Sequence, residues 1–278
     1  MTTVVFGASG NVGKYVAAGL DSLGVPVRLT SRDLSTAGFP PSADAVAADI
    51  ERPETLSAAL EGAQRVFLYA KPDGIDGFVA AAESAGVRHV VLLSSAAVVT
   101  SDPTLDPIAQ VHAIVEAAIE KSGLDWTFIR PGMFATNSLW LWQRTIRENG
   151  IVRLPYPDAR TTPVHEKDLA ALAVTALTDP GHEGRSYLVS GPEALPLRQQ
   201  VRHIGEAIGR DIVIEEVGAN QARTELLKIL PPIAADGILA AWKAGAGTSP
   251  VPTSVEAITR RPAHTFAQWA HDHAADFR

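Results

Sequence analysis

The sequence predicts a doubly wound α/β fold, and two observations carry that prediction. A short β-branched run, Val4 to Phe6, breaks at Gly7, Gly10 and Gly13 directly before a helical pattern begins. Beyond it, apolar runs of strand length alternate with amphipathic segments of helix length as far as residue 130. Strands that alternate with helices at this spacing need right-handed crossovers, so they form a parallel sheet.

The elements of this sheet follow in order along the chain. We expect strands at residues 4–6, 25–30, 44–49, 65–70, 89–93 and 125–130. The first helix ends at Gly24, because apolar residues recur at helical spacing up to that glycine. Pro53 begins the next helix, and further helices are expected at about 75–85 and 107–121.

The regular alternation loosens after residue 130. A helix bearing Trp140 and Trp142 comes next, and the later pattern indicates a helix at 166–177 with strands at 186–189 and near 212–216. We therefore expect a doubly wound domain from residues 1–130 plus about 163–190. Residues of about 131–162 and 191–278 are expected to form a smaller, mainly helical lobe.

The composition excludes several classes of protein. The 278 residues carry a formal net charge of -7 and show no cluster of Lys and Arg, which argues against nucleic-acid binding and favours small-molecule partners. The chain has no cysteine, which excludes disulfides, thiolate nucleophiles and Cys-based metal sites. No leader pattern or membrane-length apolar run is visible, so we expect a cytoplasmic protein that does not engage membranes.

The glycine-rich segment after the first strand predicts a dinucleotide site. Gly7 permits a tight turn, Gly10 lets a pyrophosphate approach the backbone, and Gly13 lets the helix pack closely on the strand. The free N–H groups of the first helical turn attract the anion. The intervening Ser9, Asn11 and Val12 complete the expected contacts; the alternative is a purely structural turn.

The end of the second strand favours NADP over NAD. In NAD-specific sites of the Rossmann type an acidic residue usually binds the ribose 2'-hydroxyl there. Here the strand closes with Thr30, Ser31 and Arg32, and a guanidinium suits a 2'-phosphate. The competing interpretation is that Arg32 lies on a solvated loop beside Asp33.

Five further residues at strand ends are expected on the cofactor face. Asp49 and Ile50 follow the third strand, where Asp49 either binds the adenine amino group or serves as an acid at a helix N-terminus. Ala70 and Lys71 close the fourth strand, and Ser94 closes the fifth.

Several segments together resemble a known family. They are GASGNVG at 7–13, LLSSAAV at 92–98, SGLDWTFIRPGMFATN at 122–137 and GHEGRSYLVSGPEAL at 181–195. The chain resembles the NmrA-like branch of the atypical short-chain dehydrogenases/reductases, in particular bacterial members similar to ergot-alkaloid-type reductases. The resemblance implies NADP(H) on the Rossmann sheet and a substrate cleft between that face and the C-terminal lobe.

One departure from the superfamily pattern concerns the proton donor. The wider superfamily uses a Ser after the fifth strand with a Tyr and a Lys four residues later. By resemblance Ser95 occupies the Ser position, while counting back from Glu116 places His112 at the Lys position and Ile108 at the Tyr position. Either His112 acts as the acid, or an activated acceptor needs no strong acid, or the chain is not catalytic.

His112 and Glu116 also stand one helical turn apart. That spacing suits two metal ligands, but no third ligand is evident, so no metal site is expected. A hydrogen-bonded His–Glu pair is the preferred interpretation.

Aromatic residues after the sixth strand predict an apolar substrate pocket. Trp140 and Trp142 cannot both face one core from a regular helix, so one of them is expected to line a cleft or a partner surface. Phe134, Asn137, Trp140 and Tyr156 are the expected pocket residues.

These observations favour an NADPH-dependent reductase that transfers hydride to an apolar or aromatic small molecule of the imine or iminium, enone or quinone type. The alternative is a non-catalytic NADP(H)-binding redox sensor or regulator of the NmrA type.

Overall fold

The computed structural model describes residues 2–104, 106–245 and 254–278 and divides the chain into two compact units. The first unit comprises Met1–Pro131, Glu166–Val189 and Ser254–Arg261. The second comprises Gly132–His165, Ser190–Thr253 and Pro262–Arg278. Within the described residues, no helix is long and apolar enough to span a membrane.

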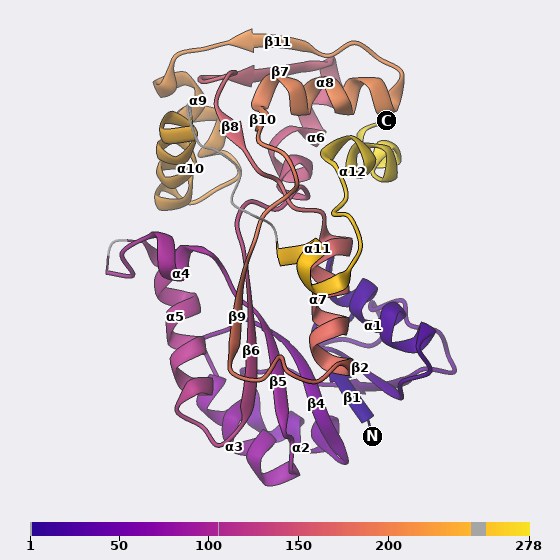
Figure 1. Ribbon diagram of the computed structural model, residues 1–278. Coiled ribbons are helices and arrows are strands. Elements are labelled where there is room, and N and C mark those ends of the chain that lie inside the picture. The colour runs from indigo at the N-terminus through magenta and orange to yellow at the C-terminus, as the bar shows by residue number, and fades with distance from the viewer. Residues whose placement is uncertain (1, 105, 246–253) are drawn as a thin grey trace. The chain divides into compact units, whose positions relative to one another are not determined.

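The first unit is built on a seven-stranded sheet with the order β3-β2-β1-β4-β5-β6-β9 (Figure 1). Every pairing in it is parallel, so all strands end at one edge, which we call the carboxyl edge. The chain order reverses between β1 and β4, which is where ligands bind in doubly wound sheets. The strands are β1 (Thr2–Val5), β2 (Val27–Ser31), β3 (Asp44–Ala47), β4 (Ala63–Tyr69), β5 (His89–Leu93), β6 (Asp125–Pro131) and β9 (Arg185–Val189).

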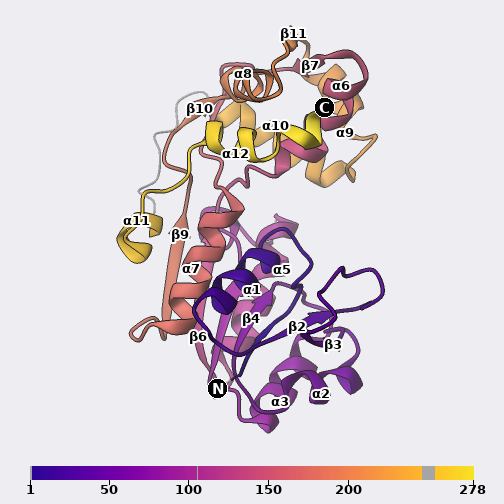
Figure 2. The same ribbon diagram turned by 90° about the vertical axis from the view of Figure 1, so that its right-hand side faces the viewer.

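Helices cover both faces of this sheet, as Figures 1 and 2 show. α1 (Gly13–Ser22) packs against α7 (Glu166–Thr178), and on the other face α3 (Ile75–Ala85) packs against α2 (Leu56–Leu60) and α5 (Pro107–Glu120). The short helix α4 (Ala97–Thr100) contacts α5. The expected doubly wound architecture is therefore confirmed.

Local sequence explains where these elements begin and end. Asp106 caps α5 by accepting hydrogen bonds from the backbone N–H groups of Ile108 and Ala109, and Pro107 occupies the first helical position. Pro53 begins a 3-10 turn (Pro53–Thr55) that leads into α2. The third strand ends at Ala47, two residues earlier than the expected 49.

The second unit has its own core and two small sheets. β10 (Leu195–Pro196) pairs antiparallel with β8 (Arg160–Thr161), and β11 (Val213–Glu216) pairs parallel with β7 (Ile151–Leu154). The helices are α6 (Asn137–Asn149), α8 (Leu197–Ile208), α9 (Ala219–Leu226), α10 (Pro232–Ala244) and α12 (Phe266–Asp272), and a 3-10 turn (Ala274–Phe277) ends the chain. The core contains Trp142, Trp242 and Trp269.

One stretch falls in a different unit from the one expected. The sequence assigned all of 191–278 to the smaller lobe, but α11 (Ser254–Thr259) packs against α7 and β9 in the first unit. Short, weakly patterned helices give no periodicity from which such packing could be predicted.

Candidate functional site

The loop between β1 and α1 has the geometry of a dinucleotide turn. Gly7 has a φ of +67°, and its carbonyl oxygen accepts a hydrogen bond from the Gly10 N–H at 2.9 Å. A Cβ on Gly13 would lie 2.1 Å from that same oxygen, so only glycine lets α1 start so close to the turn. A Cβ on Gly7 would lie 3.0 Å from the ring of Tyr69, a contact that the sequence did not single out.

The same loop presents free donors to a ligand. Ser9, Gly10 and Asn11 are exposed, and within the described residues the N–H groups of Asn11, Val12 and Gly13 donate to no protein acceptor. α1 has no side-chain cap and no acidic residue in its first turn. The positive end of the helix dipole is therefore uncompensated and fits a pyrophosphate.

Arg32 follows the end of β2 and is exposed. It makes no hydrogen bond or ion pair with any residue that the structure describes. The neighbouring Asp33 does not hold it, because the Asp33 carboxylate accepts the N–H and O–H of Ser35 at 2.8 and 2.6 Å. The guanidinium is consequently free to receive an anionic group.

Asp49 lies in a local turn next to the carboxyl edge. Its carboxylate Oδ1 accepts the Glu51 N–H at 3.1 Å, and the residue is only partly buried. Ile50 is 1 % exposed and its side chain belongs to the core, so only its backbone can reach a ligand.

Ala70 and Lys71 end β4 and are partly exposed. The Lys71 ammonium pairs with Glu51 at 2.7 Å, which raises the lysine pKa. Next to them burial raises the pKa of the Tyr69 phenol, while the positive charge of Arg32 acts in the opposite direction. The Tyr69 ring lies next to Gly7, on one side of the loop. The sequence signal that could have revealed this contact was a tyrosine at the end of a predicted strand.

Ser94 takes part in a buried network at the end of β5. Its hydroxyl donates to Glu116 Oε1 at 2.5 Å, and Arg130 donates to the same carboxylate from Nε at 2.9 Å and from Nη2 at 2.6 Å. Arg130 also donates to Ser186 Oγ at 3.2 Å. The Ser94 hydroxyl therefore donates its hydrogen to Glu116, and its oxygen remains for the cofactor contact that the sequence predicted.

The expected hydrogen bond between His112 and Glu116 is absent. Both oxygens of Glu116 are occupied by Ser94 and Arg130, and the His112 Nδ1 is buried without a partner. Arg130 is the residue that sequence reasoning missed here. A charged residue at the end of the otherwise apolar strand DWTFIR was the signal that could have revealed it.

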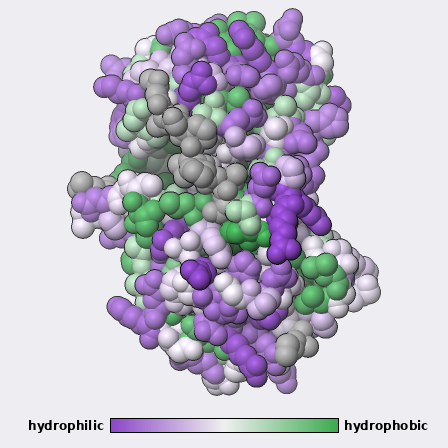
Figure 3. All heavy atoms as spheres, viewed as in Figure 1, coloured by the Kyte–Doolittle hydropathy of each residue, from purple (hydrophilic) through white to green (hydrophobic). Residues whose placement is uncertain are grey.

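Ser95 differs from Ser94 in having its hydroxyl hydrogen available. Its oxygen accepts the Ala97 N–H at 3.2 Å, and the side chain is only partly buried. Ile108 is 55 % exposed, and Figure 3 shows apolar side chains over α4 and the start of α5. The described residues contain no group of three or more potential metal ligands.

The expected pocket residues of the second unit lie around α6. Phe134 forms a parallel bridge with Val164, and Tyr156 packs against the core of this unit. Trp140 is 41 % exposed and its Nε1 points to Asn137 Oδ1 at 3.4 Å, whereas Trp142 is 3 % exposed. The two tryptophans thus face different environments, as their spacing predicted.

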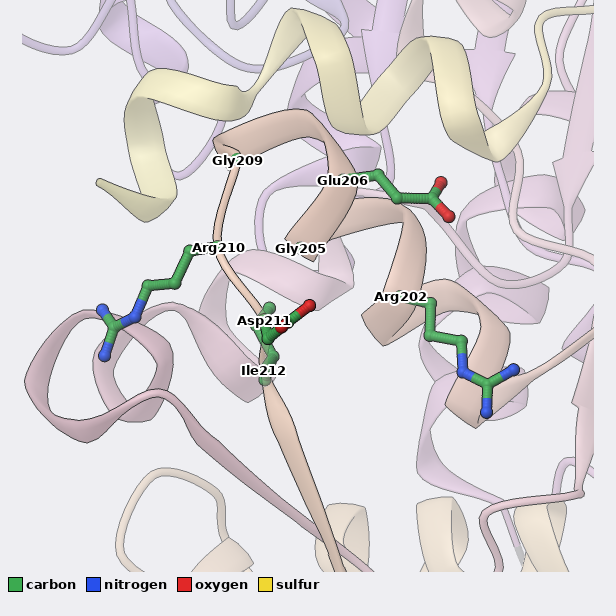
Figure 4. Close-up of a pocket in the computed structure, with 7 residues that line it drawn as sticks. All are labelled: Arg202, Gly205, Glu206, Gly209, Arg210, Asp211 and Ile212. Atoms are coloured by element: carbon green, nitrogen blue, oxygen red, sulfur yellow. The ribbon is translucent and has the colours of Figure 1, made fainter.

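A hollow of about 540 Å³ lies elsewhere in the second unit, where α8 ends and β11 begins (Figure 4). Its two guanidinium groups point apart: that of Arg210 turns away from Arg202 and donates to the carbonyl of Ile146. The polar groups of this hollow do not converge, so it is a weaker candidate than the carboxyl edge.

A doubly wound sheet with a glycine turn at its switch point and free helix N–H groups defines a dinucleotide-binding protein. Residues 7–180 match the NAD(P)H-binding family, to which the chain belongs. In agreement with the predicted NmrA-like resemblance, the chain is 30 % identical to a nitrogen metabolite regulation-like protein of Gibberella fujikuroi, over 76 % of this chain and 72 % of that one.

Several proteins to which this chain is similar are reductases. The chain is 40 % identical to a (4-alkanoyl-5-oxo-2,5-dihydrofuran-3-yl)methyl phosphate reductase of Streptomyces griseus, over 99 % of this chain and 98 % of that one. It is 31 % identical to an NAD(P)H azoreductase of Xenophilus azovorans, over the same shares. The triphenylmethane reductase of Citrobacter sp., solved with NADP(H), has the same fold: the TM-score is 0.79 at 21 % identity, over 99 % of this chain and 100 % of that one.

Proposed function

We propose that this chain is an NADPH-dependent reductase of an activated, conjugated small molecule. The observation that carries the proposal is the pairing of a free anion-binding loop at Gly7–Gly13 with an edge at which the Ser95 hydroxyl can donate a hydrogen bond. Bound NADPH supplies a hydride from its nicotinamide ring. An acceptor that is already polarised by conjugation can receive this hydride without a strong acid.

In this proposal some residues of the first unit bind the cofactor, and others fix the structure of the carboxyl edge. The loop amides bind the pyrophosphate, Arg32 binds the 2'-phosphate, and Asp49 is placed for the adenine. Ser95 and His112 face the acceptor, while the network of Ser94 fixes the end of β5. Phe134, Asn137, Trp140 and Tyr156 remain the residues proposed for a substrate pocket.

The relatives support this substrate class. The name of the Streptomyces griseus enzyme describes a ring C=C bond that carries two carbonyl groups, and the azoreductase acts on an N=N acceptor. Both acceptors are conjugated and electron-poor. Among the acceptors that the sequence left open, the enone and quinone types match the first relative best.

The test is single-turnover oxidation of NADPH, followed by its absorbance, with a panel of enones, quinones and cyclic imines. We expect oxidation with at least one conjugated carbonyl compound. NADPH binding without oxidation by any member of the panel would instead favour a redox sensor, which the exposed Ile108 in place of a tyrosine supports.

A further inference from the structure

The two nitrogens of the His112 ring lie in different surroundings. Nδ1 is sealed from solvent and has no hydrogen-bond partner, whereas Nε2 is not sealed and makes no hydrogen bond to a described residue. The Glu116 carboxylate accepts hydrogen bonds from Ser94 and Arg130 and none from His112. The His112 side chain is thus half-buried, and neither of its ring nitrogens has a hydrogen-bond partner among the described residues.

This arrangement keeps the imidazole neutral. Burial lowers the pKa of His112, and the charge of Glu116 opposes that effect only in part because Arg130 neutralises it. An imidazolium would also need an acceptor for a hydrogen on Nδ1, and the structure offers none. At neutral pH His112 therefore carries one ring hydrogen.

The position of that hydrogen follows from the cost of burial. A buried N–H without an acceptor is rarer and costlier than a buried lone pair, since desolvating an unpaired donor costs about 1–3 kcal/mol. The favoured tautomer places the hydrogen on Nε2, which water or a ligand can reach. His112 then presents a single outward N–H donor.

Helix geometry places His112 at the same edge of the sheet as Ser95. Glu116 contacts Ser94, and His112 lies four residues nearer the N-terminus of α5, about 6 Å further along the helix. α5 runs antiparallel to β5, so that displacement is directed beyond the carboxyl edge. Ser95 also lies beyond the end of β5 at Leu93, so both residues are past the same strand end.

We propose that the Nε2–H of His112 and the hydroxyl of Ser95 together bind the carbonyl oxygen of a conjugated acceptor. The inference rests on the proposed reductase function and narrows its substrate class. Two neutral donors suit an oxygen whose negative charge grows as the acceptor is reduced. An iminium ion has neither a lone pair for these donors nor a charge that they would stabilise, so the pair selects enones and quinones.

The tautomer can be tested without any ligand. In the ¹⁵N NMR spectrum of the uniformly labelled protein at neutral pH, we expect the His112 resonances of a neutral ring with hydrogen on Nε2. His112→Gln identifies those resonances. A cationic ring, or hydrogen on Nδ1, would overturn the proposal.

Carbonyl binding is measured by calorimetry with the protein saturated with NADP⁺, which cannot donate hydride, and with 1,4-naphthoquinone as the probe. His112→Gln keeps a donor near the position of Nε2, whereas His112→Asn moves it toward Nδ1 and His112→Ala removes it. We expect His112→Gln to bind within about twofold of wild type, and the other two variants and Ser95→Ala to bind about fivefold to tenfold more weakly. His182→Ala, whose Nδ1 contacts Tyr187, is the matched control and is expected to change nothing.

A second probe separates this proposal from the function on which it rests. An N-methylated cyclic iminium salt is expected to show equal affinity for wild type and His112→Ala. Equal quinone affinity in wild type, His112→Ala and Ser95→Ala, with NADPH still oxidised by quinones, would overturn the carbonyl pair and leave the reductase intact. Absence of NADPH oxidation with every acceptor would instead overturn the reductase.

Discussion

The Arg130 guanidinium donates two hydrogen bonds to the Glu116 carboxylate, from Nε to Oε1 at 2.9 Å and from Nη2 to Oε2 at 2.6 Å. The side chains of Glu116 and Arg130 are 6 % and 14 % exposed. Because Glu116 also accepts the Ser94 hydroxyl, one carboxylate ties α5 to the ends of β5 and β6. The carboxyl edge is therefore fixed by a buried ion pair.

Removing one partner of this pair should destabilise the protein strongly. Arg130→Ala leaves the Glu116 charge buried and unpaired, and we expect a loss of about 3–5 kcal/mol in the free energy of unfolding. Urea denaturation measures it. The matched control is Arg198→Ala, which breaks an equally short two-bond pair with Asp158 that lies in solvent and should change stability little. Equal effects of the two substitutions would show that burial of the Arg130–Glu116 pair does not increase its effect on the free energy of unfolding.

The glycine turn allows binding and folding to be separated. A Cβ on Gly10 meets only the Gly7 carbonyl oxygen, at 3.1 Å, and otherwise points into the pyrophosphate approach. We expect Gly10→Ala to remain folded and to bind NADPH at least about tenfold more weakly by calorimetry. Gly13→Ala, with its 2.1 Å clash, should lower the free energy of unfolding by about 3 kcal/mol or more. Unchanged NADPH affinity in Gly10→Ala would mean that the turn is structural.

Arg32 provides the test of cofactor preference. Its guanidinium has no protein partner to leave, so charge-assisted contacts to the 2'-phosphate should favour NADPH over NADH by roughly tenfold to a hundredfold. Titration of both cofactors should show that preference in wild type and its loss in Arg32→Ala. Arg52→Ala, which removes an exposed arginine paired with Glu54, should keep it. Equal affinities of wild type for NADPH and NADH would contradict the assignment.

A buried histidine, His89, and a half-buried one, His112, predict how stability depends on pH. Burial lowers the pKa of His89 and of His112, so the unfolded chain binds protons near pH 6.5 that the folded protein does not. The free energy of unfolding should therefore fall as the pH drops from about 7 to about 5. In His89→Gln, which keeps a donor for Thr127 Oγ1, the fall should be smaller. A pH profile identical to that of wild type would exclude a contribution from His89.

The fold was predictable because it rests on local signals. Glycines at fixed offsets, apolar strand runs and Pro107 at a helix start each act over a few residues, so the order of strands and helices followed from the sequence. The two-residue strands β8 and β10 were missed because they are too short to show an alternating pattern. The placement of α11 was missed because it depends on long-range packing.

The site was only partly predictable, for a physical reason. Helical spacing put His112 and Glu116 on one face, but it gave no information on Arg130, which competes for the carboxylate from another element. Charge pairing between a helix and a strand depends on how the two elements pack in the fold, and a single sequence does not state this.

The final prediction concerns the source of the proton. If His112 were the acid, the rate of reduction would fall as the pH rises through the titration range of the imidazole. Because burial lowers the His112 pKa and leaves the ring neutral, we expect single-turnover NADPH oxidation by a quinone to be flat from about pH 6.5 to about pH 9. His112→Ala should lower the rate about tenfold without a change in the shape of the profile, because a hydrogen-bond donor is lost and no titrating acid is removed. A wild-type rate that declines across this range, together with a flat profile in His112→Gln, would make His112 the proton donor and exclude its role as a neutral ligand of the carbonyl oxygen.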